Sequence, residues 1–174
     1  MSNGLGNGCY QTDPPPPITH ILETALYVRD LAASVKFYKE AFNISPFREL
    51  PSLAAISLGT TTLLLFQLGA TTGDVHTPTG TIPAHGPTAP ITASLLSTSA
   101  STPREHLGQH FCFAVARPED VQRWDDHLVA LGVPISGRMR WEGGGRSVYF
   151  VDPDGHVGEV GSRGIWPHFA IEGE

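Results

Sequence analysis

The stretch YFVDPDGHVGEV, from Tyr149 to Val160, decides how the last part of the chain folds. An apolar strand runs into the tetrapeptide DPDG at 152–155, which is a strong turn signal, and a second apolar strand follows. Glu159 lies in the middle of that second strand. An unpaired carboxylate in a dry place costs on the order of several kcal/mol. Its side chain is therefore expected to face outward, pair with a cation, or bind a metal ion.

The same order of predicted elements occurs twice along the chain. The first half has a strand at 21–28, a helix at 31–42 and strands near 47–50, 54–58 and 62–68. The second half has a strand at 110–116, a helix at about 118–131 and strands near 135–141, 147–151 and 156–161. Asp30 and Asn43 are expected to begin and end the first helix, and Gly132 to end the second. The pattern predicts an α+β fold of two βαβββ modules, each covering a sheet face of the other.

The repeat also divides the chain into regions. We expect a disordered N-terminal arm at 1–17, module one at 18–69, an insertion at 70–106, module two at 107–163 and a C-terminal tail at 164–174. The insertion is rich in Thr, Ser, Pro, Ala and Gly and has no periodicity, which predicts a long loop or a partly disordered segment. Its part at 87–106 is expected to be the most mobile, whereas TIPAHG at 81–86 is the candidate for a lid.

Composition limits the classes of partner. The 174 residues are 40% hydrophobic and carry a net charge of −6, and no run of Lys or Arg occurs. This argues against nucleic acid or an anionic membrane as partner. No apolar run approaches the roughly 18 residues that span a bilayer, and no targeting pattern begins the chain, so a cytoplasmic location is expected. Two cysteines, Cys9 and Cys112, are too few for a disulfide framework.

Three phrases carry a resemblance to a known family. LETALYVRDLAASVKFYKEAF at 22–42, GQHFCFAV at 108–115 and GGRSVYFVDPDGHVGEV at 144–160 together resemble the vicinal oxygen chelate superfamily. This superfamily includes glyoxalase I, fosfomycin-resistance thiol transferases, extradiol dioxygenases and bleomycin-binding proteins. The resemblance covers about 18–163 and implies paired glyoxalase-like modules. It also implies a metal ion held at four equivalent places, two in each module.

The resemblance assigns three metal ligands. The first-strand positions fall on Glu23 and His110, and the last-strand position of module two falls on Glu159. The last-strand position of module one falls at about Leu64, which cannot bind a metal. Two carboxylates and one imidazole balance one divalent ion, and a mostly oxygen donor set suits Mn, Fe, Ni, Mg or Zn. His20, three residues before Glu23, is the competing first ligand.

Other side chains are candidates for the chemistry. Glu23 is the first candidate for a general base and Tyr149 the second. Trp141, which precedes the glycine-rich segment EGGGRS at 142–147, and Arg146, which lies in it, are candidates for substrate binding. His85 in the insertion is a further candidate, although loop histidines are mostly solvated. For each of these residues a packing or surface role is the competing interpretation.

The resemblance implies a metal-dependent enzyme that acts on a small substrate with vicinal oxygens. A lyase, isomerase or addition reaction is expected, in which the ion stabilises a developing enolate or alkoxide. One alternative is an Fe(II) ring-cleaving dioxygenase, which generally uses two histidines and one carboxylate. Another is a non-catalytic binding protein of the bleomycin-resistance type. The resemblance also implies a homodimer, with Glu23 and the His110–Glu159 pair contributed by different chains.

Overall fold

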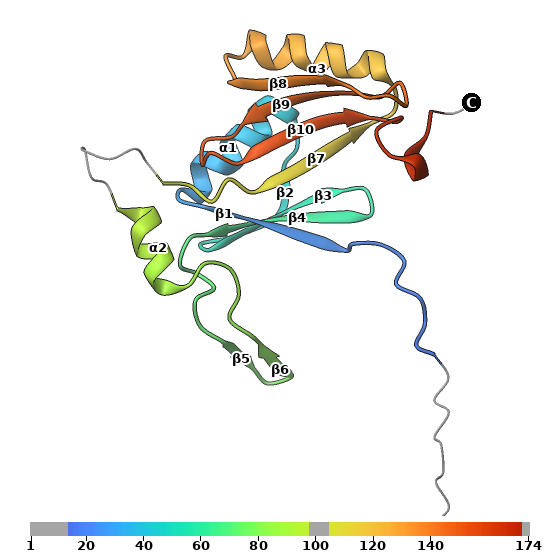
Figure 1. Ribbon diagram of the computed structural model, residues 1–174. Helices are drawn as coiled ribbons and strands as arrows, with labels where there is room; N and C mark the ends of the chain where they lie inside the picture. Colours follow the sequence, from blue (N-terminus) through green and yellow to red (C-terminus); the bar gives the residue numbers. More distant parts are fainter. Residues whose placement is uncertain (1–13, 98–104, 172–174) are drawn as a thin grey trace, which may run out of the picture.

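The computed structural model describes residues 14–97 and 105–171, and Figure 1 shows their arrangement as two four-stranded sheets with helices. Module one contains β1 (Glu23–Val28), α1 (Leu31–Phe42), β2 (Pro46–Leu50), β3 (Leu53–Leu58) and β4 (Thr61–Gln67). Module two contains β7 (His110–Val115), α3 (Pro118–Ala130), β8 (Ile135–Arg140), β9 (Arg146–Val151) and β10 (Val157–Ser162). The predicted α+β fold of two βαβββ modules is confirmed. Most of the predicted arm, together with Cys9 and residues 98–104 of the insertion, lies outside the described residues.

The two sheets have the same strand order. Module one is ordered β1-β4-β3-β2 and module two β7-β10-β9-β8. In each sheet the first strand runs parallel to the last strand of its module, and the other neighbours are antiparallel. The first and last strands of each module therefore lie side by side, which is where the metal ligands are predicted.

Helix α1 begins and ends where the sequence predicts. The Asp30 side chain accepts a hydrogen bond from the Ala33 N–H at 3.0 Å, which satisfies one of the free amides of the first turn. Asn43 ends the helix in the left-handed conformation, at φ 54°, with its N–H bonded to the Lys39 carbonyl. Both predicted caps are confirmed.

The modules share one apolar core that lies between the two sheets. Leu26 and Val28 of β1 are buried there together with α1, and Phe150 of β9 is buried there from the other module. The ring of Phe42 on α1 lies 4.9 Å from that of Phe150 and stacks at 5.5 Å on Trp124 of α3. The helices therefore join the modules, and Figure 1 shows α3 covering the module two sheet.

Polar contacts fix how module two sits on module one. The Tyr38 hydroxyl donates to Asp152 Oδ2 at 2.9 Å, and the Ser34 hydroxyl donates to Asp154 Oδ2 at 3.0 Å. The Arg29 N–H donates to Asp154 Oδ1 at 2.8 Å. Burial raises the pKa of the Asp152 carboxyl and, more strongly, that of the Tyr38 hydroxyl, so the phenol remains a donor. The two aspartates of the DPDG turn therefore hold the modules together through hydrogen bonds.

This packing leaves the second face of each sheet without a helix. On β1 the buried side chains are those of Leu26 and Val28, so strand alternation turns Glu23 to the opposite face. On β7 the pattern is exposed at His110 and partly buried at Phe111, which packs against the core. The predicted metal ligands therefore lie on faces that point away from the shared core.

Two segments have more structure than their sequences indicate. The insertion, predicted to be an irregular loop, contains the hairpin β5 (Val75–Thr77) and β6 (Gly80–Ile82) and the helix α2 (Ala89–Leu96). The tail contains a short 3-10 helix, Pro167–Phe169, that packs beside β10. Strands of three residues and a weakly amphipathic helix have too little hydrophobic periodicity to be recognised in the sequence. No helix in the described part of the chain is long and apolar enough to cross a bilayer.

Candidate functional site

His110 and Glu159 meet on the open face of module two. Val157 lies directly opposite His110 in the β7–β10 register, and Glu159 follows two residues later on the same face. The His110 Nδ1 atom lies 3.0 Å from the Val157 carbonyl oxygen. Because a carbonyl only accepts, Nδ1 carries a proton, and in the neutral ring Nε2 then presents its lone pair. That Nε2 lies 3.4 Å from Glu159 Oε2.

The other oxygen of Glu159 is held by neighbouring side chains. Ser147 on β9 donates its hydroxyl proton to Glu159 Oε1, and the Trp141 Nε1–H donates to the Ser147 hydroxyl at 2.8 Å. Glu159 is 6% exposed, so these contacts fix its orientation inside the protein. Because these hydrogen bonds use Oε1, the Oε2 atom of Glu159 receives no donor from Ser147 and points toward His110. Supporting contacts of this kind orient the ligands of metal sites.

The donor set fits a divalent cation. In the neutral ring an imidazole lone pair and a carboxylate oxygen face each other at 3.4 Å, and either a proton shared by the two atoms or a metal cation between them makes this contact favourable. One carboxylate and one imidazole are two of the three predicted ligands. Within the described residues of one chain, no group of three or more His, Cys, Asp or Glu side chains is placed to hold a metal ion. One chain therefore brings together two of the three predicted ligands.

Glu23, the third predicted ligand, lies apart from this pair. It is exposed at the start of β1, and its side chain makes no hydrogen bond or ion pair with another described residue. Thr62 is its register partner on β4, and Leu64 follows two residues later. Leu64 therefore occupies in module one the place that Glu159 occupies in module two, and no ligand is available there. His20, the competing ligand, is exposed and contacts Thr19.

Trp141 and Tyr149 lie with His110 and Glu159 around one pocket. The pocket has a volume of about 410 Å³, and the Tyr149 and His110 rings are 6.2 Å apart. Its lining is formed by His110, Cys112, Ala114, Trp141, Tyr149, Glu159, Gly161, Ser162, Ile165, Trp166, His168 and Phe169. Burial, and next the charge of Glu159, raise the pKa of the Tyr149 hydroxyl. At neutral pH Tyr149 is therefore a hydrogen-bond donor rather than a base.

Arg146 does not join this group. Ser147 and Tyr149 point toward Glu159, so alternation along β9 turns Arg146 and Val148 to the α3 side of the sheet. Arg146 lines a different and smaller pocket, of about 200 Å³, with Arg138 and Arg140 of β8. Along β9, Ser147 and Tyr149 face Glu159, and the alternate residues face α3.

His85 packs against the open face of module one. Its ring lies 5.2 Å from that of Phe66 and 6.5 Å from that of Tyr27, edge-on to both. Its backbone N–H donates to the Thr71 carbonyl at 3.0 Å. The next residue, Gly86, has φ +80°, and a Cβ there would lie 2.3 Å from the Tyr27 ring. The insertion is therefore closely packed on the open face of module one, and none of its described residues lines the pocket that contains His110.

Two further features belong to the surroundings of the site. Cys112 lies opposite Glu159 in the register, and burial, followed by the charge of Glu159, raises the pKa of its thiol to about 12. The thiol is therefore protonated at neutral pH. A cavity of about 500 Å³ lies between the modules, but its lining is mostly apolar and holds no carboxylate or imidazole. It offers space without ligands for a metal.

Ser147 and the tail were not identified by sequence reasoning. Ser147 has the same parity as Tyr149, so strand alternation offered a signal for it. For the tail the signal lies in the composition. Three consecutive glycines occur at 143–145, and the phrase IWPHF at 165–169 concentrates large apolar and aromatic side chains near the end of the sequence. A close backbone crossing requires such glycines.

Comparison with known proteins agrees with this architecture. A solved structure described as lactoylglutathione lyase from Agrobacterium tumefaciens is 32% identical to this chain. The likeness covers 87% of this chain and 99% of that one, with a TM-score of 0.70. A glyoxalase/bleomycin resistance protein/dioxygenase from Nocardioides, 19% identical, has a TM-score of 0.59 over 92% of this chain and 91% of that chain and shows the fold alone.

Sequence comparison adds one curated relative. Metallothiol transferase FosB from Bacillus licheniformis is 40% identical over 58 residues, which are 33% of this chain and 37% of that protein. The match therefore covers little more than a third of the relative's length. A family model described as Glyoxalase/Bleomycin resistance protein/Dioxygenase superfamily matches residues 18–160. The chain belongs to the Glyoxalase/Bleomycin resistance protein/Dioxygenase superfamily, also called the vicinal oxygen chelate superfamily.

Proposed function

We propose that this protein is a metal-dependent enzyme whose site is completed by a second copy of the chain. His110 and Glu159 of one chain and Glu23 of the other would hold one divalent ion. The observation that carries the proposal is the pair of acceptors in the pocket, His110 Nε2 and Glu159 Oε2, which face each other at 3.4 Å. Such a pair is favourable with a cation between its members.

The position of Glu23 supports a site shared between chains. Glu23 lies on a sheet face without a helix and has no partner among the described residues. Just before it, Ile18, Ile21 and Leu22 are 95%, 71% and 67% exposed. Exposed apolar residues of this size, clustered next to an unpaired carboxylate, are favourably buried against another molecule. Two-fold symmetry would then form two identical sites in one homodimer.

The donor set restricts both the ion and the reaction. Two carboxylates and one imidazole suit Mn, Fe, Ni, Mg or Zn and balance a charge of +2. A bound ion of this kind supplies Lewis-acid stabilisation of negative charge that develops on a substrate oxygen. A small substrate with vicinal oxygens would match its adjacent open positions. Lyase, isomerase or addition chemistry fits this arrangement.

The chain's own residues would have separate tasks. Ser147 and Trp141 hold Glu159 in its binding orientation. Tyr149, whose hydroxyl pKa is raised by burial, would donate a hydrogen bond to a substrate oxygen. Glu23 is exposed and has no hydrogen bond that fixes it, so its carboxylate is the group best able to accept a substrate proton.

A mixed dimer tests the shared site directly. A Glu23→Ala chain and a Glu159→Ala chain, carrying different affinity tags, are mixed, and the heterodimer is isolated. Its metal content is then measured by mass spectrometry after dialysis. In the heterodimer, Glu23 of the second chain meets His110 and Glu159 of the first, so one of the two sites is intact. We expect one ion per heterodimer and none in the Glu159→Ala homodimer.

The same experiment separates the alternatives. A heterodimer that binds no more metal than the Glu159→Ala homodimer would contradict the shared site. A monomer by sedimentation velocity at micromolar concentration would contradict it as well. The wild-type dimer, with two ions, and a chain with Val129→Ala on the outer side of α3, exposed at 52%, serve as controls.

A further inference from the structure

The C-terminal segment 163–171 is attached across the β8–β9 turn. The Gly164 N–H donates to the Phe169 carbonyl at 2.8 Å, and the Phe169 N–H donates to the Trp166 carbonyl at 2.9 Å. The Arg163 guanidinium lies 4.6 Å from the centre of the Phe169 ring, on one of its faces. These contacts fold the segment back on itself at the end of β10.

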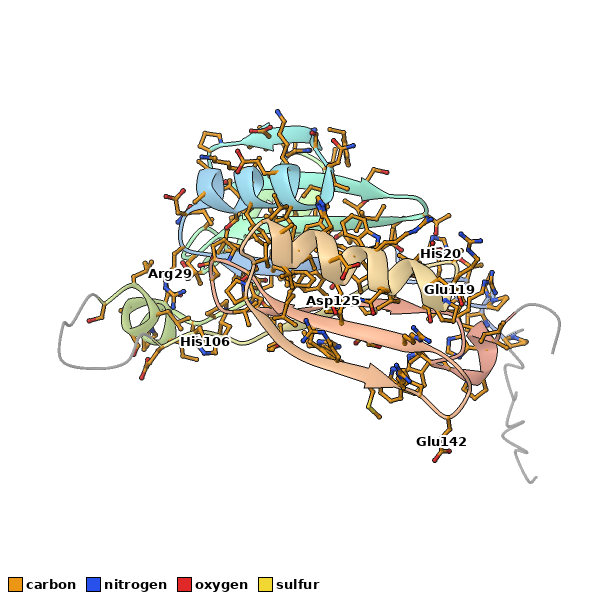
Figure 2. All side chains as sticks on the ribbon, turned by 90° about the horizontal axis from the view of Figure 1, so that it is seen from above. His20, Arg29, His106, Glu119, Asp125 and Glu142 are labelled. Carbon is orange, nitrogen blue, oxygen red and sulfur yellow. The ribbon has the colours of Figure 1, made fainter. Side chains whose placement is uncertain are left out.

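Glycines allow this attachment. A Cβ at Gly143 would lie 2.6 Å from the Gly164 carbonyl oxygen, and a Cβ at Gly145 would lie 2.6 Å from the Gly164 carbonyl carbon. Gly164 itself has φ +88°, and its Cβ would lie 2.3 Å from the Gly143 carbonyl oxygen. Side chains at these positions would force the two backbones apart. Figure 2 labels Glu142, which precedes this crossing, at the end of the molecule opposite Arg29 and His106.

The attached segment forms one wall of the pocket that contains His110 and Glu159. Ile165, Trp166, His168 and Phe169 all line it. Ile165 packs over β10 so closely that a Cβ at Gly161 would lie 2.7 Å from its Cδ1 atom. The lining also carries the rings of Trp141 and Tyr149. Four aromatic side chains and an isoleucine therefore surround the two metal ligands.

The charged residues of the lining also restrict which substrate groups can bind in the pocket. Among the described residues that line this pocket there is no Lys or Arg, and Glu159 is the one carboxylate. Apart from the proposed metal ion, a substrate group with a negative charge, such as a phosphonate or a second carboxylate, would find no Lys or Arg side chain there to compensate it. An apolar ring would instead bury its surface against Trp166, which is 61% exposed.

We infer that the segment 163–171 selects the substrate, and that the substrate carries an uncharged aromatic or branched apolar group next to its two chelating oxygens. The inference rests on the proposed metal site, because the chelating oxygens are bound there. Trp166 would act as the specificity residue that covers the apolar group. The class of substrate is therefore defined by two neighbouring oxygens and an adjacent ring of about the size that the pocket of about 410 Å³ accommodates.

Binding of hydroxamates tests the inference without knowledge of the substrate. Hydroxamates chelate a metal through two neighbouring oxygens, and the full-length, Mn-loaded protein is titrated with them by calorimetry. Benzohydroxamate is expected to bind about tenfold tighter than acetohydroxamate, because its ring is buried. Adding a carboxylate to the ring, in 4-carboxybenzohydroxamate, should remove that gain of about tenfold, since a buried charge would lack a partner.

Variants assign the effect to the segment. Trp166→Ala should weaken benzohydroxamate binding about fivefold or more, whereas acetohydroxamate binding and metal content stay within about twofold of wild type. Trp166→Phe keeps a ring and should restore most of the loss. Val129→Ala, on the outer side of α3, should leave both probes unchanged. Circular dichroism spectra verify the fold, and wild-type discrimination among the three probes stands as a test independent of any variant.

The outcomes separate the inference from the proposed function. If the protein binds metal, and benzohydroxamate and acetohydroxamate bind to it with equal affinity, the metal site stands. Substrate selection by the segment 163–171 is then wrong. This selection is also wrong if the carboxylated probe binds as tightly as benzohydroxamate. It is likewise wrong if Trp166→Ala still binds benzohydroxamate more tightly than acetohydroxamate by the wild-type factor. If neither metal nor any hydroxamate binds, the proposed function fails and the inference fails with it.

Discussion

In module two the open sheet face carries side chains that hold one another in place, whereas in module one it carries a carboxylate without a partner. His110 is oriented by the Val157 carbonyl, and Glu159 by Ser147. Glu23 is exposed and has no comparable contact among the described residues. Because the strand order and the register are the same in both modules, the difference lies in the side chains. One repeat fixes the side chains of its two predicted ligands, and the other leaves the side chain of its predicted ligand without a comparable contact in the described part of the chain.

The two modules also differ in what covers them. Each last strand is followed by a segment that turns back onto the open face of its own module. After β4 the insertion packs His85 onto Tyr27 and Phe66, and after β10 the tail places Trp166 in the pocket that contains His110 and Glu159. Among the described residues that line the pocket of His110 and Glu159, several belong to the second cover and none to the first. Corresponding positions in a repeat can therefore acquire different roles.

The largest expected effect follows replacement of a ligand in the fixed half. His110→Ala removes the imidazole lone pair that faces Glu159, and we expect metal affinity to fall by more than about 100-fold, beyond the usual cost of losing a supporting contact. Metal content after dialysis measures this. Glu159→Ala should behave in the same way. Stoichiometric metal in both variants would show that module two does not hold the ion.

The next effect concerns the group in module one. Glu23→Gln keeps an oxygen ligand but cannot accept a proton, so the metal should remain while turnover of a vicinal-oxygen substrate falls by about 100-fold or more. Steady-state kinetics and metal analysis of the same preparation give the comparison. Near-normal turnover would restrict Glu23 to a role as ligand. Loss of the ion would mean that its charge is needed for binding.

A smaller effect is expected from the contact that orients Glu159. Ser147→Ala removes the hydroxyl that donates to Glu159 Oε1 and should weaken metal binding by about 10- to 100-fold. Competition with a chelating dye measures the affinity. Ser136→Ala, an exposed serine on β8, is the matched control and should bind metal as wild type does. Equal affinities in the two variants would mean that Glu159 needs no such support.

The smallest effect is expected one residue away. Arg146→Ala should change metal affinity and hydroxamate affinity by less than about twofold, because strand alternation places Arg146 on the α3 side of β9. The pair Arg146→Ala and Ser147→Ala therefore tests the sidedness of one strand. A large loss of ligand affinity in the arginine variant would return Arg146 to the substrate site.

The sequence by itself determined the elements of the fold and the identity of several site residues, because these follow from local rules. The Asp30 and Asn43 caps bound one helix, and a period of two along β10 separates Glu159 from the core-facing Val160. Trp141 and Tyr149 were found next to the glycine-rich turn, and they lie in the pocket. Such signals require only neighbours in the chain.

Only the tertiary structure decided which of these residues meet. The contacts of Tyr38 with Asp152 and of Phe42 with Phe150 place the helices between the sheets, so the ligand-bearing faces point away from the shared core. Glu23 is thereby separated from His110, although the repeat places them at equivalent positions. The attachment of the tail across the glycines likewise depends on backbones that are distant in sequence. Contacts of this kind depend on packing between elements, which periodicity within an element does not encode.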